Sequence, residues 1–148
     1  GASAPLGEGM GEWWGDAMGR VWGWEVKKKN LTTWWQNVPD DTRKKLTFNN
    51  NPVSPSEFEA TLVASVRPQD YVVVKLDIDT IVIEAAILGI IEKHATLVDE
   101  LFYEYHIYYD GLDFGWHTKI DRTTRNVTTS VRHMQRLRKK GIRAHFWV

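Results

Sequence analysis

The residues best suited to chemistry are Asp77 and Asp79, which end an apolar run that begins at Asp70. The run is rich in β-branched residues, as expected of a strand buried on both faces in a parallel sheet. Ligands of open α/β sheets bind at the carboxyl ends of such strands, and side chains two residues apart point to the same face. We therefore expect the two carboxylates in a functional site. The alternative is that they cap the following helix, whose N-terminus favours anions.

A second polar pair, Glu104 and His106, lies in a strand predicted over residues 97–108. Period-two alternation places both side chains on one face of that strand, opposite its apolar face. His106 is suited to accept a proton, with Glu104 to orient it. Equally, His106 is a strand histidine satisfied by Glu104 or a backbone carbonyl, and Glu104 is a partner for a lysine. Lys75, inside the apolar run, needs a nearby carboxylate because an unpaired buried charge is costly.

The elements that must position these residues alternate along the chain. Strands are predicted at residues 20–25, 46–49, 70–79, 97–108 and 142–148. Helical spacing falls between them, at residues 31–38, 54–67, 83–91 and 127–140. Ser54 and Pro55 mark a helix start, and Gly141 marks a helix end. The alternation predicts a Rossmann-like α/β fold, a three-layer sandwich around a mostly parallel sheet.

Composition excludes several classes of protein. Nineteen basic and nineteen acidic residues balance, which argues against nucleic acid as a partner. The chain has no cysteine, so disulfides, thiolate metal sites and cysteine nucleophiles are excluded. No apolar run approaches the roughly 20 residues needed to span a bilayer. We expect a soluble protein, intracellular or organellar.

The first 19 residues are predicted to be an irregular, Gly-rich leader, ahead of one domain over residues 20–148. Gly7, Gly9 and Gly11 have the G-x-G-x-G spacing of a nucleotide-binding loop. However, no hydrophobic strand precedes them, as such a loop requires. A flexible leader is the favoured interpretation, because this composition cannot offset the entropy lost on ordering.

Several segments resemble the FkbM-type S-adenosylmethionine-dependent methyltransferases, especially their algal and plant-like members. Residues 73–79 are similar to the family's fourth-strand motif, apolar-Lys-apolar-Asp-apolar-acid-Gly. Residues 97–106 are similar to its fifth strand, which ends in Glu-x-His, and residues 21–25 to its second strand, which ends in an acid. Residues 134–147 are similar to its late helix and strand. The resemblance covers roughly residues 20–148.

The chain departs from the family pattern at two places. Thr80 stands where the family usually has glycine, so a positive φ is less accessible there. The first strand and its glycine-rich cofactor loop are not recognisable. In the family that strand lies between the second and fourth strands, so without it the sheet has a gap in its middle. Either residues 1–20 fill this gap in an unusual way, or the first strand is missing from this chain, or the domain is degenerate.

The resemblance implies transfer of a methyl group from S-adenosylmethionine to an oxygen of a small acceptor. It assigns Glu25 to the cofactor's ribose hydroxyls and places Asp77 and Asp79 beside the reacting methyl group, with Asp77 also contacting the cofactor. The base that takes the acceptor's proton is His106 or Asp77. Lys75 and Glu104 have supporting roles, and no metal ion belongs to this interpretation.

A non-catalytic function stays open. A methyltransferase-like domain without a cofactor loop can serve as a scaffold subunit of a larger protein assembly. It would dock through its Trp-rich N-terminal third, since exposed aromatic residues favour interfaces. For the tryptophans of this third, a role as core or interface anchors is favoured over a role in a ligand-binding cage. These residues are Trp13, Trp14, Trp34 and Trp35.

A metal-dependent enzyme is the other alternative. An apolar strand that ends Asp-x-Asp is how many nucleotide-sugar transferases hold a divalent cation through carboxylate oxygens. Asp77 and Asp79 fit that spacing, although a metal is not the favoured interpretation. The phosphatase pattern Asp-x-Asp-x-Thr fits less well, because Thr80 comes one place early and the motif belongs on a first strand.

Overall fold

The structure is a computed structural model that describes residues 18–107 and 123–147. The chain forms two compact units, Gly1–Val53 and Ser54–Val148. Each unit contains a parallel sheet of its own, with two strands in the first and three in the second. The chain therefore has the Rossmann-like α/β class with mostly parallel strands that its sequence predicts, in a small and incomplete form.

The first unit is one strand–helix–strand crossover. Its elements are β1 (Val21–Trp24), α2 (Leu31–Gln36), α3 (Asp40–Lys45) and β2 (Leu46–Asn49). The two strands pair in register, from Val21 opposite Leu46 to Trp24 opposite Asn49. Asn30 caps α2, because its side-chain oxygen accepts from the backbone N–H groups of the first turn.

Aromatic stacking joins α2 to β2 in this unit. The rings of Trp34 and Phe48 are stacked with centroids 4.0 Å apart. Trp35 meets the same Phe48 ring edge-on at 6.3 Å. These contacts agree with the packing role predicted for Trp34 and Trp35. Trp13 and Trp14, like the glycines of the leader, lie outside the described residues.

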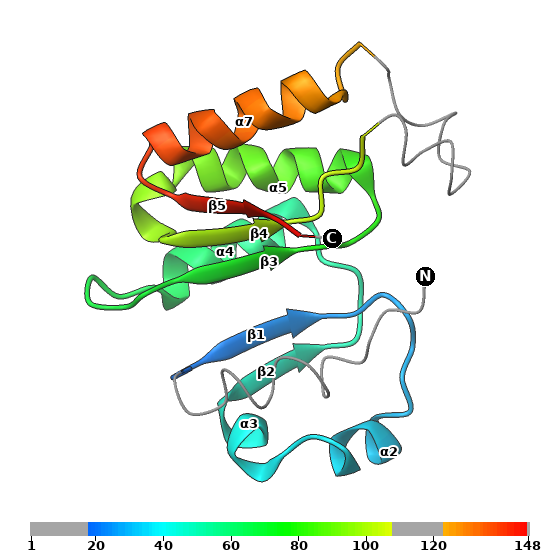
Figure 1. Ribbon diagram of the computed structural model, residues 1–148. Helices are drawn as coiled ribbons and strands as arrows, with labels where there is room; N and C mark the ends of the chain where they lie inside the picture. The colour runs from blue at the N-terminus through cyan, green and yellow to red at the C-terminus, as the bar shows by residue number, and fades with distance from the viewer. Residues whose placement is uncertain (1–17, 108–122, 148) are drawn as a thin grey trace. The chain divides into compact units, whose positions relative to one another are not determined.

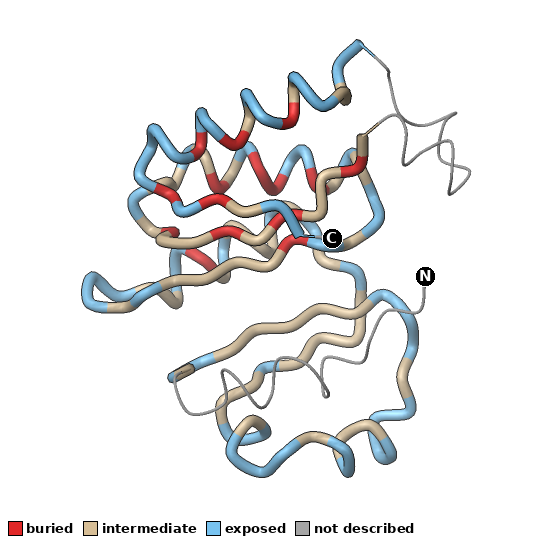
Figure 2. The backbone as a smooth tube through the Cα atoms, viewed as in Figure 1, coloured by how far each residue is buried: buried red, intermediate tan, exposed pale blue. Residues whose placement is uncertain are grey.

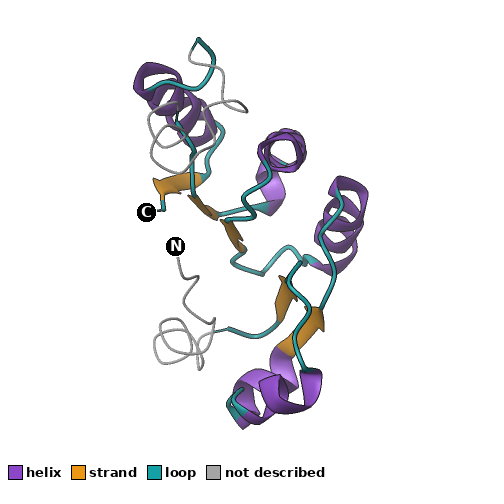
Figure 3. Cartoon of the chain, turned by 90° about the vertical axis from the view of Figure 1, so that its right-hand side faces the viewer, coloured by secondary structure: helices purple, strands orange, loops and turns teal. Residues whose placement is uncertain are grey.

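The second unit continues the alternation of helices and strands (Figure 1). Its elements are α4 (Pro55–Ser65), β3 (Val73–Leu76), α5 (Ile81–Lys93), the 3₁₀ turn η1 (Ala95–Leu97), β4 (Glu100–Tyr103), α7 (Val127–Lys139) and β5 (Arg143–Phe146). The strands lie in the order β3-β4-β5, all parallel. Figures 1 and 3 both show α5 and α7 on one side of this sheet.

The core of this unit lies between the sheet and these two helices (Figure 2). Leu101 and Ala144 are partners in the ladder and are both fully buried. They face apolar side chains of α5 and α7, namely Ile87, Leu88, Ile91, Met134 and Leu137. Period two along the strands and a helical stripe on each helix therefore produce this core.

The opposite face of the sheet is only half-buried. Lys75, Phe102 and His145 lie side by side in the ladder, and the rings of Phe102 and His145 stack with centroids 4.9 Å apart. Only Leu76 is buried among the four residues of β3. The prediction of a strand buried on both faces is therefore wrong for β3. One reason is that α5 and α7 cover one face of this sheet (Figure 1), and the other face is half-buried in the central strand β4 as well. In addition, β3 is an edge strand, with β4 as its neighbour.

The helix ends follow the chemistry read from the sequence. The Ser54 hydroxyl accepts from the backbone N–H of Glu57 at 3.1 Å, and Pro55 is the first helical residue of α4. Gly141 follows α7 with φ 96°, a conformation that glycine adopts at little cost. In β5 (Arg143–Phe146) Ala144 is fully buried, whereas Phe146, two residues further on, is 44% exposed. No helix of residues 18–107 and 123–147 has the length and apolar character to cross a membrane.

Candidate functional site

The polar residues predicted at the ends of two strands do come together. The carboxyl ends of β3 and β4 meet at one edge of the sheet, because the strands are parallel neighbours. There, Nε2 of His106 lies 3.5 Å from Oδ1 of Asp79 and 3.9 Å from Oε2 of Glu104. His106 is itself buried, although the sequence places it on the polar face of a strand. The difference arises because β4 ends at Tyr103 and the chain then turns.

Asp79 reaches this position through an unusual backbone conformation. Its φ is 54°, in the left-handed region that non-glycine residues rarely adopt. The neighbouring Thr80 has φ −125° and begins α5. The turn is therefore made at Asp79, a residue type that tolerates this region, one residue before the position where the family pattern has glycine. The Asp79 side chain is 66% exposed, so it forms the solvent side of the site.

Glu84 completes the site, and sequence reasoning missed it. It lies in the first turn of α5 and is fully buried. Its Oε1 is 3.8 Å from Nε2 of His106. We call Asp79, Glu84, Glu104 and His106 the His106 cluster. The available signal was that Glu84 precedes Ile87 and Leu88 by three and four residues, which places an acid on the apolar stripe of a helix.

Tyr103 and Arg125 hold the second oxygen of Glu84. The Tyr103 hydroxyl lies 3.3 Å from Oε2 of Glu84 and donates to it, while Arg125 donates to Tyr103 at 2.8 Å. The Arg125 guanidinium is 3.9 Å from the same carboxylate. Burial raises the pKa of Glu84, and the charge of Arg125 acts in the opposite direction. The Glu84 carboxylate thus lies in the core, with Tyr103 and the positive charge of Arg125 stabilising only its Oε2 atom.

Asp77 lies beside the cluster and pairs with Lys75. The Lys75 ammonium donates to Asp77 and also lies 4.8 Å from the ring centroid of Trp147, so the predicted carboxylate partner of this lysine is confirmed. The interaction with Asp77, with burial second, raises the pKa of Glu104 to about 8. Burial raises the pKa of Asp77, but its interactions with Glu104 and Lys75 outweigh this and lower it. The two carboxyls therefore share a proton at neutral pH.

Glu25 belongs to the first unit, and its carboxylate is held by its own turn. Oε1 accepts from the backbone N–H of Lys27 at 2.8 Å, and Oε2 lies 3.4 Å from Nζ of Lys29. The backbone N–H of Glu25 donates to the carbonyl of Asn49, at the end of β2. Its assignment to cofactor ribose hydroxyls stays a prediction.

Three members of the His106 cluster form a possible metal-binding group. One ligand atom from each of Asp79, Glu104 and His106 lies within 4.8 Å of the others. The Asp-x-Asp interpretation pairs Asp79 with Asp77. In this group, instead, the partners of Asp79 come from the segment after β4. Carboxylate oxygen and imidazole nitrogen are both common ligands of divalent ions.

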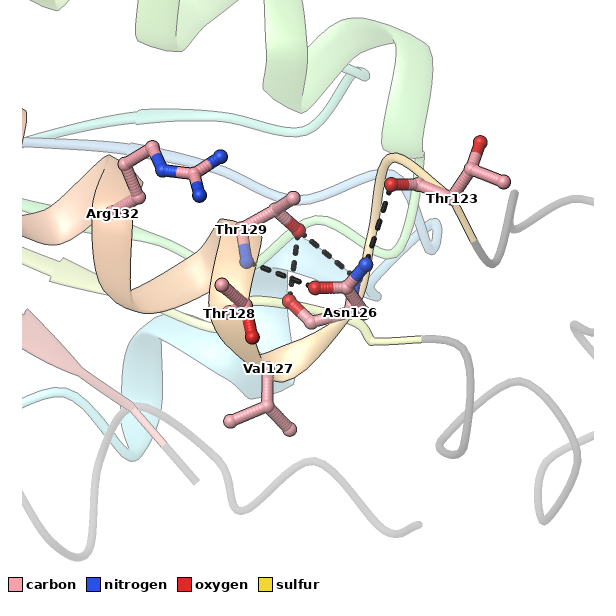
Figure 4. Close-up of a pocket in the computed structure, with 6 residues that line it drawn as sticks. All are labelled: Thr123, Asn126, Val127, Thr128, Thr129 and Arg132. Atoms are coloured by element: carbon pink, nitrogen blue, oxygen red, sulfur yellow. Dashed lines mark hydrogen bonds between the residues drawn. The ribbon is translucent and has the colours of Figure 1, made fainter.

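The polar residues that line a shallow pocket at the start of α7 have a structural role (Figure 4). Asn126 caps the helix: its side-chain oxygen accepts from the backbone N–H of Thr129 at 3.0 Å, and its own N–H donates to the Thr129 hydroxyl at 2.9 Å. Its amide nitrogen also donates to the carbonyl of Thr123 at 3.3 Å. These hydrogen bonds form a capping box, which stabilises the helix start.

No protein-family model, curated protein or solved structure gives a significant match to this chain. The similarity to FkbM-type methyltransferases therefore rests on the sequence motifs alone. The arguments for function that follow depend on the His106 cluster and its surroundings.

Proposed function

We propose that this protein transfers a methyl group from S-adenosylmethionine to an oxygen of a small acceptor, with the acceptor held at the His106 cluster. The observation that supports this proposal is the convergence of Asp79, Glu104 and His106 at the carboxyl edge of two adjacent parallel strands. This edge is where open α/β sheets bind their ligands. The donor is the one that the sequence resemblance implies.

Asp77 is the better of the two predicted bases. A base must come within hydrogen-bond reach of the proton that it removes. The Asp77 side chain is 31% exposed, whereas that of His106 is 4% exposed and faces three carboxylates. In the proposed step the acceptor oxygen bonds to the methyl carbon while the sulfur–carbon bond breaks, and its electron pair stays on sulfur. The hydroxyl proton passes to the Asp77 carboxylate.

Calorimetric titration of the full chain with S-adenosylmethionine tests the donor. We expect micromolar binding that is lost in Glu25→Ala and, because Asp77 is also predicted to contact the cofactor, weakened in Asp77→Asn. With methyl-labelled donor and a panel of small hydroxylated acceptors, Asp77→Asn should slow product formation at least about a hundredfold, the range of general base catalysis. His145→Gln is the matched control, because His145 bonds at 2.8 Å to Glu100, the first residue of β4, at the opposite end of that strand from the cluster. Absence of donor binding would overturn the proposal and favour the scaffold function.

A cation-dependent transferase is the second candidate, because Asp79, Glu104 and His106 form a possible metal-binding group. The two candidates share an acceptor site. They differ in whether a metal ion takes part in the reaction, and the buried carboxylate of Glu84 bears on this difference.

A further inference from the structure

An unsatisfied carboxylate oxygen lies in the core of the second unit. Glu84 is fully buried, and its Oε1 has no hydrogen-bond partner among the described residues. Buried polar atoms are nearly always satisfied, and a buried charge without compensation is strongly unfavourable. Tyr103 and Arg125 act on the other oxygen of this carboxylate. Within the described part of the chain, Oε1 therefore has no side-chain donor at hydrogen-bond distance, and its nearest polar neighbour given by the ion-pair distances is the His106 imidazole.

Oε1 points into the His106 cluster. It lies 3.8 Å from Nε2 of His106, the atom that is also 3.5 Å from Asp79 and 3.9 Å from Glu104. These separations exceed the usual length of a hydrogen bond. Two ligands that each bind one ion at about 2.1 Å lie about 3 Å apart at right angles and about 4 Å apart when opposite. The distances from Nε2 to the three carboxylates thus suit ligands of one cation, and the ligand atoms of Asp79, Glu104 and His106 also lie within 4.8 Å of one another.

The charge of the cluster leads to the same conclusion. Three carboxylic acids surround one imidazole nitrogen at the end of the sheet. Of the cationic side chains that the structure describes near the cluster, Lys75 pairs with Asp77, and Arg125 lies 3.9 Å from Oε2 of Glu84. Neither donates a hydrogen bond to Oε1 of Glu84. A divalent ion between the carboxylates and Nε2 would supply the missing charge.

We propose that the four side chains of the His106 cluster bind one divalent metal ion of the Mn²⁺ kind, with Glu84 as the interior ligand. An oxygen-rich set suits Mn²⁺ and Mg²⁺, and the imidazole nitrogen favours the transition metal. Glu84 binds the ion from inside the core, while Asp79, 66% exposed, binds it from the solvent side. The ion stays open to a further ligand on that side.

The metal site goes beyond the proposed function and does not depend on it. If methyl transfer also holds, the open position of the ion would bind the acceptor oxygen next to Asp77. A metal ion makes such an oxygen easier to deprotonate. With His106 as a ligand, Asp77 is the one predicted base that lies outside the metal site.

Titration with Mn²⁺ tests the site without any methyl donor. The full chain, treated with a chelator and then freed of it, is titrated with MnCl₂ while electron paramagnetic resonance records the free ion. We expect one bound ion per chain with micromolar affinity. Asp79→Asn and Glu84→Gln should each weaken binding at least about tenfold, as loss of a ligand does at metal sites. The matched control is His145→Gln, which removes a histidine–carboxylate pair at the opposite end of β4 from the cluster and should bind Mn²⁺ like the wild type.

Two results would overturn the site. The first is no binding of Mn²⁺ by the wild-type chain up to millimolar concentration. The second is wild-type affinity for Mn²⁺ in Glu84→Gln, because that result would show that Glu84 is not a ligand. Circular dichroism of each variant in chelator separates loss of binding from loss of fold, and Asp79→Asn provides an exposed site where unfolding is not expected. The Mn²⁺ titration contains no S-adenosylmethionine, so its outcome is independent of the donor titration. Either experiment can therefore fail while the other succeeds.

Discussion

The Tyr103 hydroxyl donates a hydrogen bond of 3.3 Å to the buried carboxylate of Glu84, from the last residue of β4 to the first turn of α5. Both side chains are fully buried, and Arg125 donates to the same hydroxyl at 2.8 Å. This contact links the sheet to the helix that covers it. It also fixes the orientation in which Glu84 presents its other oxygen to His106.

Removal of this donor should destabilise the protein. In Tyr103→Phe, Oε2 of Glu84 loses its hydrogen bond inside the core, which costs about 1.5–3 kcal/mol for a charged acceptor. Urea unfolding in the presence of chelator measures the change. In a Glu84→Gln background the same substitution should cost less, because the acceptor is then neutral. Equal costs in the two backgrounds would contradict the hydrogen bond to a charged carboxylate.

The backbone of Asp79 gives a separate prediction. Its φ of 54° is disfavoured for a residue with a Cβ and readily adopted by glycine. Asp79→Gly should therefore be more stable than Asp79→Ala by about 1 kcal/mol in chelator. Both variants remove the carboxylate, so their difference isolates the backbone term. Urea unfolding midpoints measure it, and equal midpoints would show that the turn is made in another way.

Two glycines should respond to the same substitution with opposite signs. Gly89 lies inside α5 with open space around it, so Gly89→Ala should stabilise the protein by about 1 kcal/mol through helix propensity. Gly141 also has open space, but its φ is 96°, so Gly141→Ala should destabilise by about 1 kcal/mol or more. Thermal unfolding of the two variants side by side tests this. A loss of stability in Gly89→Ala would mean that the helix is tightly covered there.

The pH dependence of stability should involve Glu92. Burial raises its pKa, but hydrogen bonds and charge from Arg136, with Lys140 behind them, lower it below the ordinary 4.5. Arg136 donates to Oε1 of Glu92 at 2.7 and 3.0 Å, which ties α7 to α5. A lowered pKa means that the folded state holds this proton less tightly than the unfolded state. Its stabilisation is therefore present above pH 4.5 and is lost as pH falls through the folded pKa.

Glu92→Gln tests this sign. At pH 7 the variant should be less stable by about 0.5–1 kcal/mol, the scale of a partly exposed ion pair. The gap between the wild type and the variant should close over the pH range below 4.5, as the wild-type carboxyl takes up its proton. Urea midpoints measured at several pH values give the curve. A gap that persists at the acid end of this range would assign the effect to packing.

The order of elements could be predicted because it depends on local pattern. Each predicted strand contains an observed one, and the helix starts at Ser54 and Asn126 follow from side chains that cap the first turn. The convergence of Asp79 with His106 could also be predicted, since it needs only two parallel neighbouring strands. These features are set by spacing within a short window and by one rule of sheet geometry.

The interior of the site could not be predicted in the same way. The spacing of Glu84 from Ile87 and Leu88 places an acid on the apolar stripe of α5, but it does not reveal that Tyr103 and Arg125 support this acid in the core. The positive φ of Asp79 depends on how the chain must turn to enter α5. Likewise, β4 stops at Tyr103 although the alternating pattern continues past it. Each of these depends on tertiary contacts that no short window of sequence contains.

Arg125 also has a consequence for engineering. It donates to the backbone carbonyl of His106 at 2.9 Å, and its guanidinium covers the ring of Tyr105 at 4.6 Å. Arg125, which lies just before α7, therefore holds the segment that follows β4 at Tyr105 and His106. Changes to this region should keep Arg125, because this one side chain holds both the backbone of His106 and the ring of Tyr105.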